Sequence, residues 1–172
     1  TNLVTNPSLE DLTPDGFAAG WKGGEFGKPG TNVLSESKYA HSGKRSVRVG
    51  TSPGSFVTCA AAPIVVKPQT TYFLSWWCKT EGMDFSRAYV FLQTNKGQRV
   101  VPNDSQYGTQ DWAQHFGQYT TTAEETLLYP ILTTQHTTGP AAQAYFDDIG
   151  LYEGRFPEPL FTTYQGYQRN LR

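Results

Sequence analysis

The sequence predicts an all-β protein in which two antiparallel sheets pack face to face. Aromatic residues make up 14% of the 172 residues, and the chain contains 17 Gly and 11 Pro. This composition is typical of strands joined by many turns. Gly or Pro interrupts nearly every window, and no stretch shows the apolar spacing of a helix. Seven or more short strand-like segments follow one another instead, which favours a two-sheet sandwich.

The individual strands are predicted from alternating apolar and polar residues, or from runs of aromatic and β-branched residues. Residues 46–49 and 87–93 alternate, whereas residues 71–79 are rich in aromatic and β-branched side chains. The other expected strands are residues 55–66, 112–121, 127–134 and 144–152. Turn-forming residues separate these segments, at 67–69, 95–97, 103–104 and 138–140.

The two cysteines, Cys59 and Cys78, permit one disulfide. We expect residues 65–71 to form the turn of a hairpin in which Val66 pairs with Thr71. That register places Cys59 directly opposite Cys78, and a shift of one residue would destroy the arrangement. The cysteine spacing matches no zinc or redox motif, so the sequence leaves a disulfide and two buried thiols as the alternatives.

The length of the chain is sufficient for one domain with a substantial core. We expect this domain to cover residues 1–154. Residues 155–172 begin with a Pro-spaced connector and are interpreted as a linker or tail toward a partner domain, the alternative being a tail folded back on the sandwich. The net charge of −1 predicts no polybasic face, which argues against nucleic acid or an anionic membrane as partners, and no apolar run reaches the length of a membrane span.

Two adjacent carboxylates, Asp147 and Asp148, interrupt the apolar run of residues 144–152. Strand alternation places Asp147 on the core side with Ile149, and Asp148 on the outer side. A buried carboxylate without a partner is costly, so a cation or a set of hydrogen bonds must neutralise Asp147. Glu10 is a second acid in an apolar context near the N-terminus. A Ca²⁺ ion between the two ends of the domain would account for both acids, and hydrogen bonds to backbone amides are the alternative.

Two of the predicted strands have an outward-facing row of aromatic and polar side chains. In each strand the neighbouring apolar positions fill the inward row, and we expect the two strands to lie side by side in one sheet. Aromatic rings and planar polar groups recognise neutral sugars, so this surface is a candidate binding site. The candidate residues are Trp77, Lys79, Arg87, Tyr89, Phe91 and Gln93. The alternative is that loops or a neighbouring domain cover this face, with Trp77 and Phe91 buried.

Catalysis is not expected from the sequence. The acidic residues are scattered and lie mostly in turns, whereas a glycosidase needs two carboxyl groups facing one cleft. No Ser-His-Asp order, phosphate-binding loop or zinc motif is present. A polysaccharide lyase remains a further alternative, although the nearest candidate motif, residues 134–137, falls in an expected loop.

Four landmarks in order across residues 2–153 resemble the jelly-roll carbohydrate-binding modules attached to xylanases and β-glucanases, the group that includes families 4, 9, 16 and 22. The landmarks are residues 2–10 followed by Gly20-Trp21, residues 41–49, residues 68–79 and residues 145–151. The resemblance implies a jelly-roll fold with a structural Ca²⁺ that ties the first segment to the last strand. Carried over to this chain, its ligands would be the side chains of Glu10 and Asp147, a carbonyl at the Gly43-Lys44 turn, and Ser8.

The resemblance also implies a function. It is that of a non-catalytic module of a larger secreted, glycan-degrading protein, covalently linked to a catalytic domain, with a plant, algal or microbial polysaccharide as ligand. Its location would be extracellular, periplasmic or at the cell surface. The alternative is a structural sandwich that docks on a neighbouring catalytic domain and has no affinity for sugar.

Overall fold

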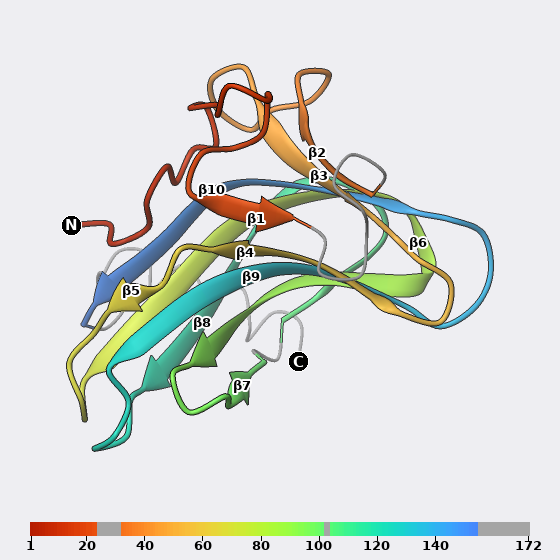
Figure 1. Ribbon diagram of the computed structural model, residues 1–172. Helices are drawn as coiled ribbons and strands as arrows, with labels where there is room; N and C mark the ends of the chain where they lie inside the picture. The colour runs from red at the N-terminus through yellow and green to blue at the C-terminus, as the bar shows by residue number, and fades with distance from the viewer. Residues whose placement is uncertain (24–31, 102–103, 155–172) are drawn as a thin grey trace.

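The computed structural model describes residues 1–23, 32–101 and 104–154, and the expected linker at 155–172 lies outside the described residues. Within these ranges the regular elements are ten strands (Figure 1). None of the described residues belongs to a helix long and apolar enough to cross a membrane. The strands are β1 (Trp21–Gly23), β2 (Val33–Glu36), β3 (Ser46–Gly50), β4 (Phe56–Ala61), β5 (Ile64–Val65), β6 (Thr71–Thr94), β7 (Arg99–Val100), β8 (Gln106–Thr120), β9 (Leu127–His136) and β10 (Gln143–Glu153).

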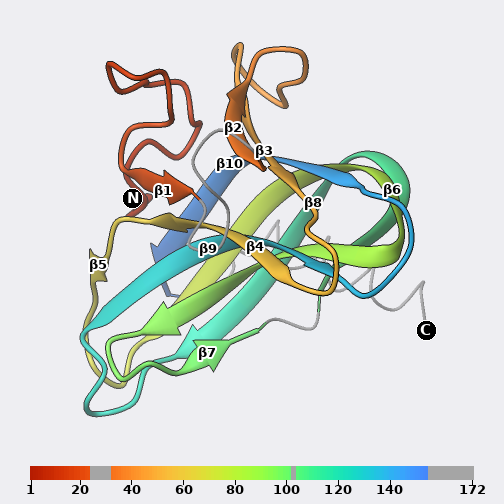
Figure 2. The ribbon, with the colours of Figure 1, turned by 45° about the vertical axis from the view of Figure 1, so that its right-hand side comes forward.

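Strand β6 belongs to both layers of the sandwich. Its first part, residues 71–81, pairs with β10 and β8, whereas its second part, residues 86–94, pairs with β9 and β7 and, at Ala88, with the start of β8 (Figure 1 and Figure 2). Gly82, at a φ of 76°, lies between the two parts, where the pairing with β8 shifts register. A left-handed backbone angle suits Gly because it has no Cβ. The strand therefore bends here and continues from one layer into the other.

The two layers are named by their strands. Layer A consists of β2, β3, β10, the first part of β6 and β8. Layer B consists of the second part of β6, β9, β4 and β1, with β7 and β5 paired at its margins. All of these pairs are antiparallel, which confirms the predicted two-sheet antiparallel sandwich.

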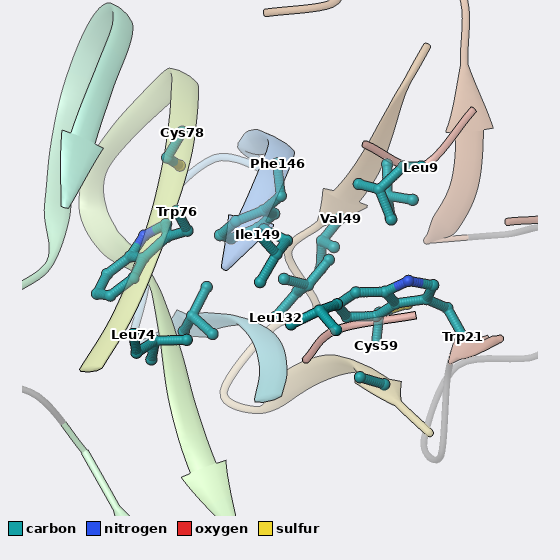
Figure 3. Packing of buried hydrophobic residues seen from close by; sticks show 14 of the residues in the cluster. Leu9, Trp21, Val49, Cys59, Leu74, Trp76, Cys78, Leu132, Phe146 and Ile149 are labelled. Atoms are coloured by element: carbon teal, nitrogen blue, oxygen red, sulfur yellow. The ribbon is translucent and has the colours of Figure 1, made fainter. Parts of the chain in front are cut away.

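The hydrophobic core lies between the layers and includes the inward rows that alternation predicts. Leu74 and Trp76 of layer A face the same cluster as Leu132 of layer B (Figure 3). Val90 of layer B belongs to this cluster as well. Each of these side chains is almost completely buried. Full burial of such side chains contributes roughly 1.5–3 kcal/mol each, so this cluster is the main source of stability.

The predicted hairpin around residues 65–71 is wrong. Cys59 pairs with Leu132 in layer B, whereas Cys78 pairs with Phe146 in layer A, so the cysteines lie on opposite sides of the core (Figure 3). The physical reason is that β5 pairs with β9, and the chain then crosses to the other layer instead of turning back. Both cysteines are free and fully buried, and desolvation raises the pKa of each thiol far above its ordinary value.

Candidate functional site

The structure divides the predicted sugar-binding residues between two surfaces. Trp77 and Lys79 lie in the part of β6 that belongs to layer A, whereas Arg87, Tyr89, Phe91 and Gln93 lie in the part that belongs to layer B. The expectation that the two stretches are neighbours in one sheet is therefore wrong. They are consecutive parts of one bent strand, and alternation alone does not reveal that the bend changes the layer.

The outer face of layer B carries a small apolar floor. Tyr89, Phe91 and Ile131 form a cluster separate from the main core, with Ala60 and Tyr129 packed against it. The register explains the floor, because Phe91 lies opposite Ile131 on β9. Directly opposed residues of an antiparallel pair share one face of the sheet. The sequence thus places a continuous apolar strip on the outer face of layer B.

Two guanidinium groups cover this floor. The guanidinium carbon of Arg87 lies 4.6 Å from the centre of the Tyr89 ring, and that of Arg99 lies 5.2 Å from the centre of the Phe91 ring. Tyr89 and Phe91 each retain only 3% of their exposure. Phe91 is therefore buried, as the alternative predicted. The group that covers it, however, is the side chain of Arg99 from β7, whereas the prediction named loops or a neighbouring domain. These contacts have the geometry of cation–π interactions.

Two hollows follow one another along β6 and β9 on this face, and we call them together the cleft. One, of ≈ 410 Å³, is lined by Lys22, Gly23, Thr58, Ala60, Phe91, Gln93, Arg99, Tyr129 and Ile131. The other, of ≈ 290 Å³, is lined by Asp84, Phe85, Ser86, Arg87, Tyr107, Gln135, Thr137 and Thr138. They lie in line because Arg87 pairs with Gln135 and Phe91 pairs with Ile131 on the same two strands. The arrangement suits an extended ligand.

Gln135 orders the polar groups of the cleft. Its Oε1 accepts a hydrogen bond of 2.9 Å from Nε of Arg87 and a longer one, of 3.4 Å, from the hydroxyl of Tyr89. Desolvation raises the pKa of Tyr89 despite the nearby guanidinium groups of Arg87 and Arg99, so its hydroxyl remains a neutral donor. Gln135 is absent from the predicted sugar-binding residues because residues 134–137 were expected in a loop, and this expectation is wrong, since β9 continues to His136. Arg99 is absent because a two-residue strand gives no periodic signal.

On the outer face of layer A, Trp77 packs against the chain segment before β3. The ring of His41 stacks on that of Trp77 at 3.8 Å between centroids, and His41 Nδ1 lies 2.6 Å from Oδ2 of Asp148. The Nζ of Lys79 lies 4.8 Å from the centre of the Tyr39 ring. Trp77 is thus half-buried, with one ring face occupied by an imidazole. We call Tyr39, His41, Trp77 and Lys79 the layer A cluster.

The predicted metal ligands meet at one turn, residues 41–45. Oδ2 of Asp147 accepts hydrogen bonds from the N–H groups of His41 (2.9 Å) and Ser42 (3.1 Å), and its Oδ1 accepts one from Asp148 (2.8 Å). Asp147 is completely buried, as predicted, and desolvation raises its pKa to about 7. The alternation argument fails at this point, because Asp147 pairs with the outward Trp77 and the register shifts between Asp147 and Gly150.

Glu10 binds the other end of the same turn. Its Oε1 and Oε2 accept hydrogen bonds of 2.8 Å from the N–H groups of Lys44 and Arg45. Gly43 has a φ of 62°, and an added Cβ would lie 2.6 Å from the Glu10 carboxyl group. Both the backbone angle and this close approach require glycine here.

Ser8 lies in the turn closed by the hydrogen bond from Leu9 N–H to the Asn6 carbonyl. This turn is tied to the last strand, because the Ile149 N–H donates to the Pro7 carbonyl. The structure therefore brings the four predicted ligands to the same end of the domain, where the first and last segments meet.

The donor set has capacity left for a cation. A carboxylate has about four acceptor positions, of which Asp147 uses three and Glu10 uses two for backbone N–H groups. The described residues contain no cluster of three or more His, Cys, Asp or Glu side chains that could hold a metal. An ion at this turn would therefore need backbone carbonyls, which Ca²⁺ readily accepts. The hydrogen bonds from backbone N–H groups to Asp147 and Glu10 are also the ones expected if no metal is bound.

Comparison with known proteins places this geometry in context. Residues 1–141 match the family CBM_4_9, described as a carbohydrate binding domain. A family 16 carbohydrate binding module has a TM-score of 0.61 and 21% identity, covering 88% of this chain and 100% of its own. The CBM22-1 xylan-binding domain of Paenibacillus barcinonensis Xyn10C has a TM-score of 0.61 and 18% identity, and the match covers 91% of this chain and 99% of that domain.

A third similar structure is TmCBM61 in complex with β-1,4-galactotriose, with a TM-score of 0.61, 15% identity, and coverage of 90% of this chain and 99% of that one. No curated protein matches the chain significantly. At these identities the structural likenesses establish the shared fold. The family match covers most of the chain, and the protein therefore belongs to the carbohydrate binding domain family, whose members are non-catalytic carbohydrate-binding modules.

Proposed function

We propose that the domain binds a polysaccharide chain in the cleft on the outer face of layer B. The observation that carries this proposal is the line of two hollows along β6 and β9, with an apolar floor and polar side chains at its margin. Sites for sugars and other small ligands combine such apolar surfaces with a few oriented polar groups. Two structures of the same fold are described as a xylan-binding domain and as a complex with β-1,4-galactotriose.

The cleft offers two kinds of contact to a sugar. Tyr129 lines the cleft and is partly buried, and Phe56, which pairs with Gln135 beside the cleft, is 36% exposed, so both rings are available for stacking against the CH-rich face of a pyranose. Arg87, Arg99 and Gln135 present planar polar groups that hydrogen-bond sugar hydroxyls. Because the contact is small and wet, the affinity of a single site is expected to lie in the micromolar to millimolar range.

In a larger protein, this domain would hold a covalently linked catalytic domain close to its polymeric substrate and so raise the effective concentration of that substrate. Such a protein is expected to be secreted or located at the cell surface, with a plant, algal or microbial polysaccharide as its target. The alternative is a docking domain without sugar affinity.

A structural Ca²⁺ at the 41–45 turn is part of the same proposal. The side chains of Glu10 and Asp147, with carbonyl groups of Lys44 and Ser8, would hold it. The ion would supply positive charge to a completely buried carboxylate, whose burial is otherwise opposed by desolvation. It would join the first segment of the chain to the last strand and so favour the folded state.

Affinity gel electrophoresis with a panel of polysaccharides tests the binding function. We expect at least one polymer to retard the wild-type domain, and Gln135→Ala and Tyr129→Ala to reduce that retardation about fivefold or more. Trp77→Ala is the matched control, because it truncates an aromatic ring on the outer face of layer A. Loss of retardation only in Trp77→Ala would move the site to the layer A cluster. The absence of retardation with every polymer would favour the docking alternative.

A further inference from the structure

We propose that the cleft prefers polysaccharides whose sugars carry negative charges, as carboxylate or sulfate groups. This inference rests on the proposed function, because it concerns the ligand class of the same site. The chain as a whole has a net charge of −1, yet the cleft is lined by three cations, Lys22, Arg87 and Arg99, and by one carboxylate, Asp84. The cleft is thus positive on a slightly negative protein.

The three cations of the cleft lack carboxylate partners in the part of the chain that the structure describes. Four other described Lys and Arg side chains have carboxylate partners, among them Lys67 with Glu153 at 3.2 Å and Lys96 with Glu124 at 3.6 Å. Lys38, Lys44 and Arg45 have none among the described residues, but they lie outside the cleft. By the same distance criterion, no described carboxylate pairs with Lys22, Arg87 or Arg99. Unpaired cations that gather on one face attract anionic ligands and raise the rate of their association.

The cover of the aromatic floor gives a second, independent argument. The rings of Tyr89 and Phe91 are 3% exposed, so a sugar cannot stack on them until the guanidinium groups move away. A neutral sugar that did so would cost two cation–π contacts. An anionic group does not require this movement, because a guanidinium can remain stacked on a ring and still bind a carboxylate or sulfate through its edge.

The donors needed for that contact are present. Arg87 uses Nε for one hydrogen bond to Gln135 while its guanidinium lies over Tyr89, which leaves its other N–H groups for a ligand. The guanidinium of Arg99 makes no hydrogen bond or ion pair within the described ranges, and it lies over the rings of Phe91 and Phe56. The rings of Tyr89 and Phe91 are 6.3 Å apart between centroids, so the two guanidinium groups cover neighbouring rings. Two cations over neighbouring rings of β6 suit a polymer with repeated charges better than a single small anion.

Isothermal titration calorimetry with three polymers tests the inference: polygalacturonate for carboxylate, a carrageenan for sulfate, and neutral xylan. At 20 mM NaCl we expect at least tenfold tighter binding of one or both anionic polymers than of xylan. We also expect that preference to fall about tenfold or more at 500 mM NaCl, because salt screens the charges. Binding of polygalacturonate alone, or of the carrageenan alone, supports the inference and identifies the charged group.

The double variant Arg87→Gln, Arg99→Gln should lose most of the preference for the anionic polymers. Lys38→Gln is the control, because it removes one positive charge next to Tyr39 in the layer A cluster. Circular dichroism verifies that each variant is folded. Binding of xylan as tightly as the anionic polymers would overturn the inference but leave the proposed function intact. Binding of none of the three polymers would overturn the inference, and retardation by another polymer of the panel would then keep the proposed function. An anionic preference that survives the double variant would overturn the assignment to the cleft.

Discussion

The two outer faces of the sandwich begin from the same sequence pattern and reach different structures. Each part of β6 presents an alternating row of aromatic and polar side chains to the outside. In layer B the rings are covered by two long, flexible arginine side chains at the margin of a cleft. In layer A the ring of Trp77 is covered by His41, whose segment is fastened to Asp147 and Asp148.

This difference shows that the covering element decides what an outward aromatic residue does. A guanidinium group at the end of a flexible side chain can be rearranged by a ligand, since it is held by one hydrogen bond or none within the described ranges. The imidazole of His41 is fixed by its own backbone N–H and by its ring nitrogen. Layer B is therefore suited to binding, and layer A to connecting the first and last segments of the chain.

Calcium removal is expected to have the largest effect, and it acts on the layer A side alone. If Ca²⁺ is present at a thousandfold excess over its Kd, it stabilises the domain by about 4 kcal/mol, which is roughly 8–16 °C in Tm. Differential scanning calorimetry with calcium and with a chelator measures this shift. Glu10→Gln should remove most of the response to the chelator. An unchanged midpoint would exclude the metal and leave the backbone hydrogen bonds as the whole explanation.

Gly43→Ala should destabilise the turn that supports the layer A cluster. The added Cβ would approach the Glu10 carboxyl group to 2.6 Å at a φ of 62°. We expect a loss of about 2–4 kcal/mol in the free energy of unfolding, measured in urea. Gly54→Ala is the matched control, since Gly54 has a similar φ of 64° but open space around it. It should cost about 1–2 kcal/mol, and equal losses would mean that the contact with Glu10 contributes nothing.

Trp77→Ala should lower stability and leave sugar binding unchanged. It removes the stack with His41, worth about 0.5–1.5 kcal/mol beyond the lost burial. Urea unfolding measures the first effect, and affinity electrophoresis measures the second. A loss of polysaccharide affinity larger than that of Tyr129→Ala would contradict the division of roles between the two faces.

Tyr89→Phe should have the smallest effect. It removes a hydroxyl that donates a long, 3.4 Å hydrogen bond to Gln135, so we expect a change of about 0.5 kcal/mol in stability. Burial raises the pKa of Tyr89 above its ordinary value, so the hydroxyl is expected to stay neutral around neutral pH. Polysaccharide affinity should therefore be constant between pH 7 and pH 9 in both proteins. A difference between wild type and variant that grows with pH in this range would show that the hydroxyl ionises.

Much of the architecture could be predicted from local patterns. The inward rows at Leu74 and Val90 are in the core as predicted, and Glu10 and Asp147 both accept hydrogen bonds from the turn at residues 41–45. Membership of the carbohydrate binding domain family confirms the resemblance and the prediction of a non-catalytic module. These successes share a cause, because alternation and turn residues report on burial and on chain reversal.

The failures also share a cause. Alternation reports which face of a strand is buried, but it does not report which sheet the strand joins. Residues 71–79 and 87–93 were therefore expected in one sheet, although Gly82 marks the bend between two layers. The register shift in β10 is a second case, since it reverses the phase at Asp147. Arg99 is a third, because the two-residue strand β7 that places it opposite Gln93 is too short to show a period.

The positions of Cys59 and Cys78 have a practical consequence. A fully buried thiol with a raised pKa contains almost no thiolate at neutral pH and reacts poorly with alkylating reagents. A cysteine introduced at an exposed position, such as Thr109 beside the bend of β6, would therefore be the preferred target for a fluorophore. The natural residues can stay in place while binding to immobilised polymers is followed by fluorescence.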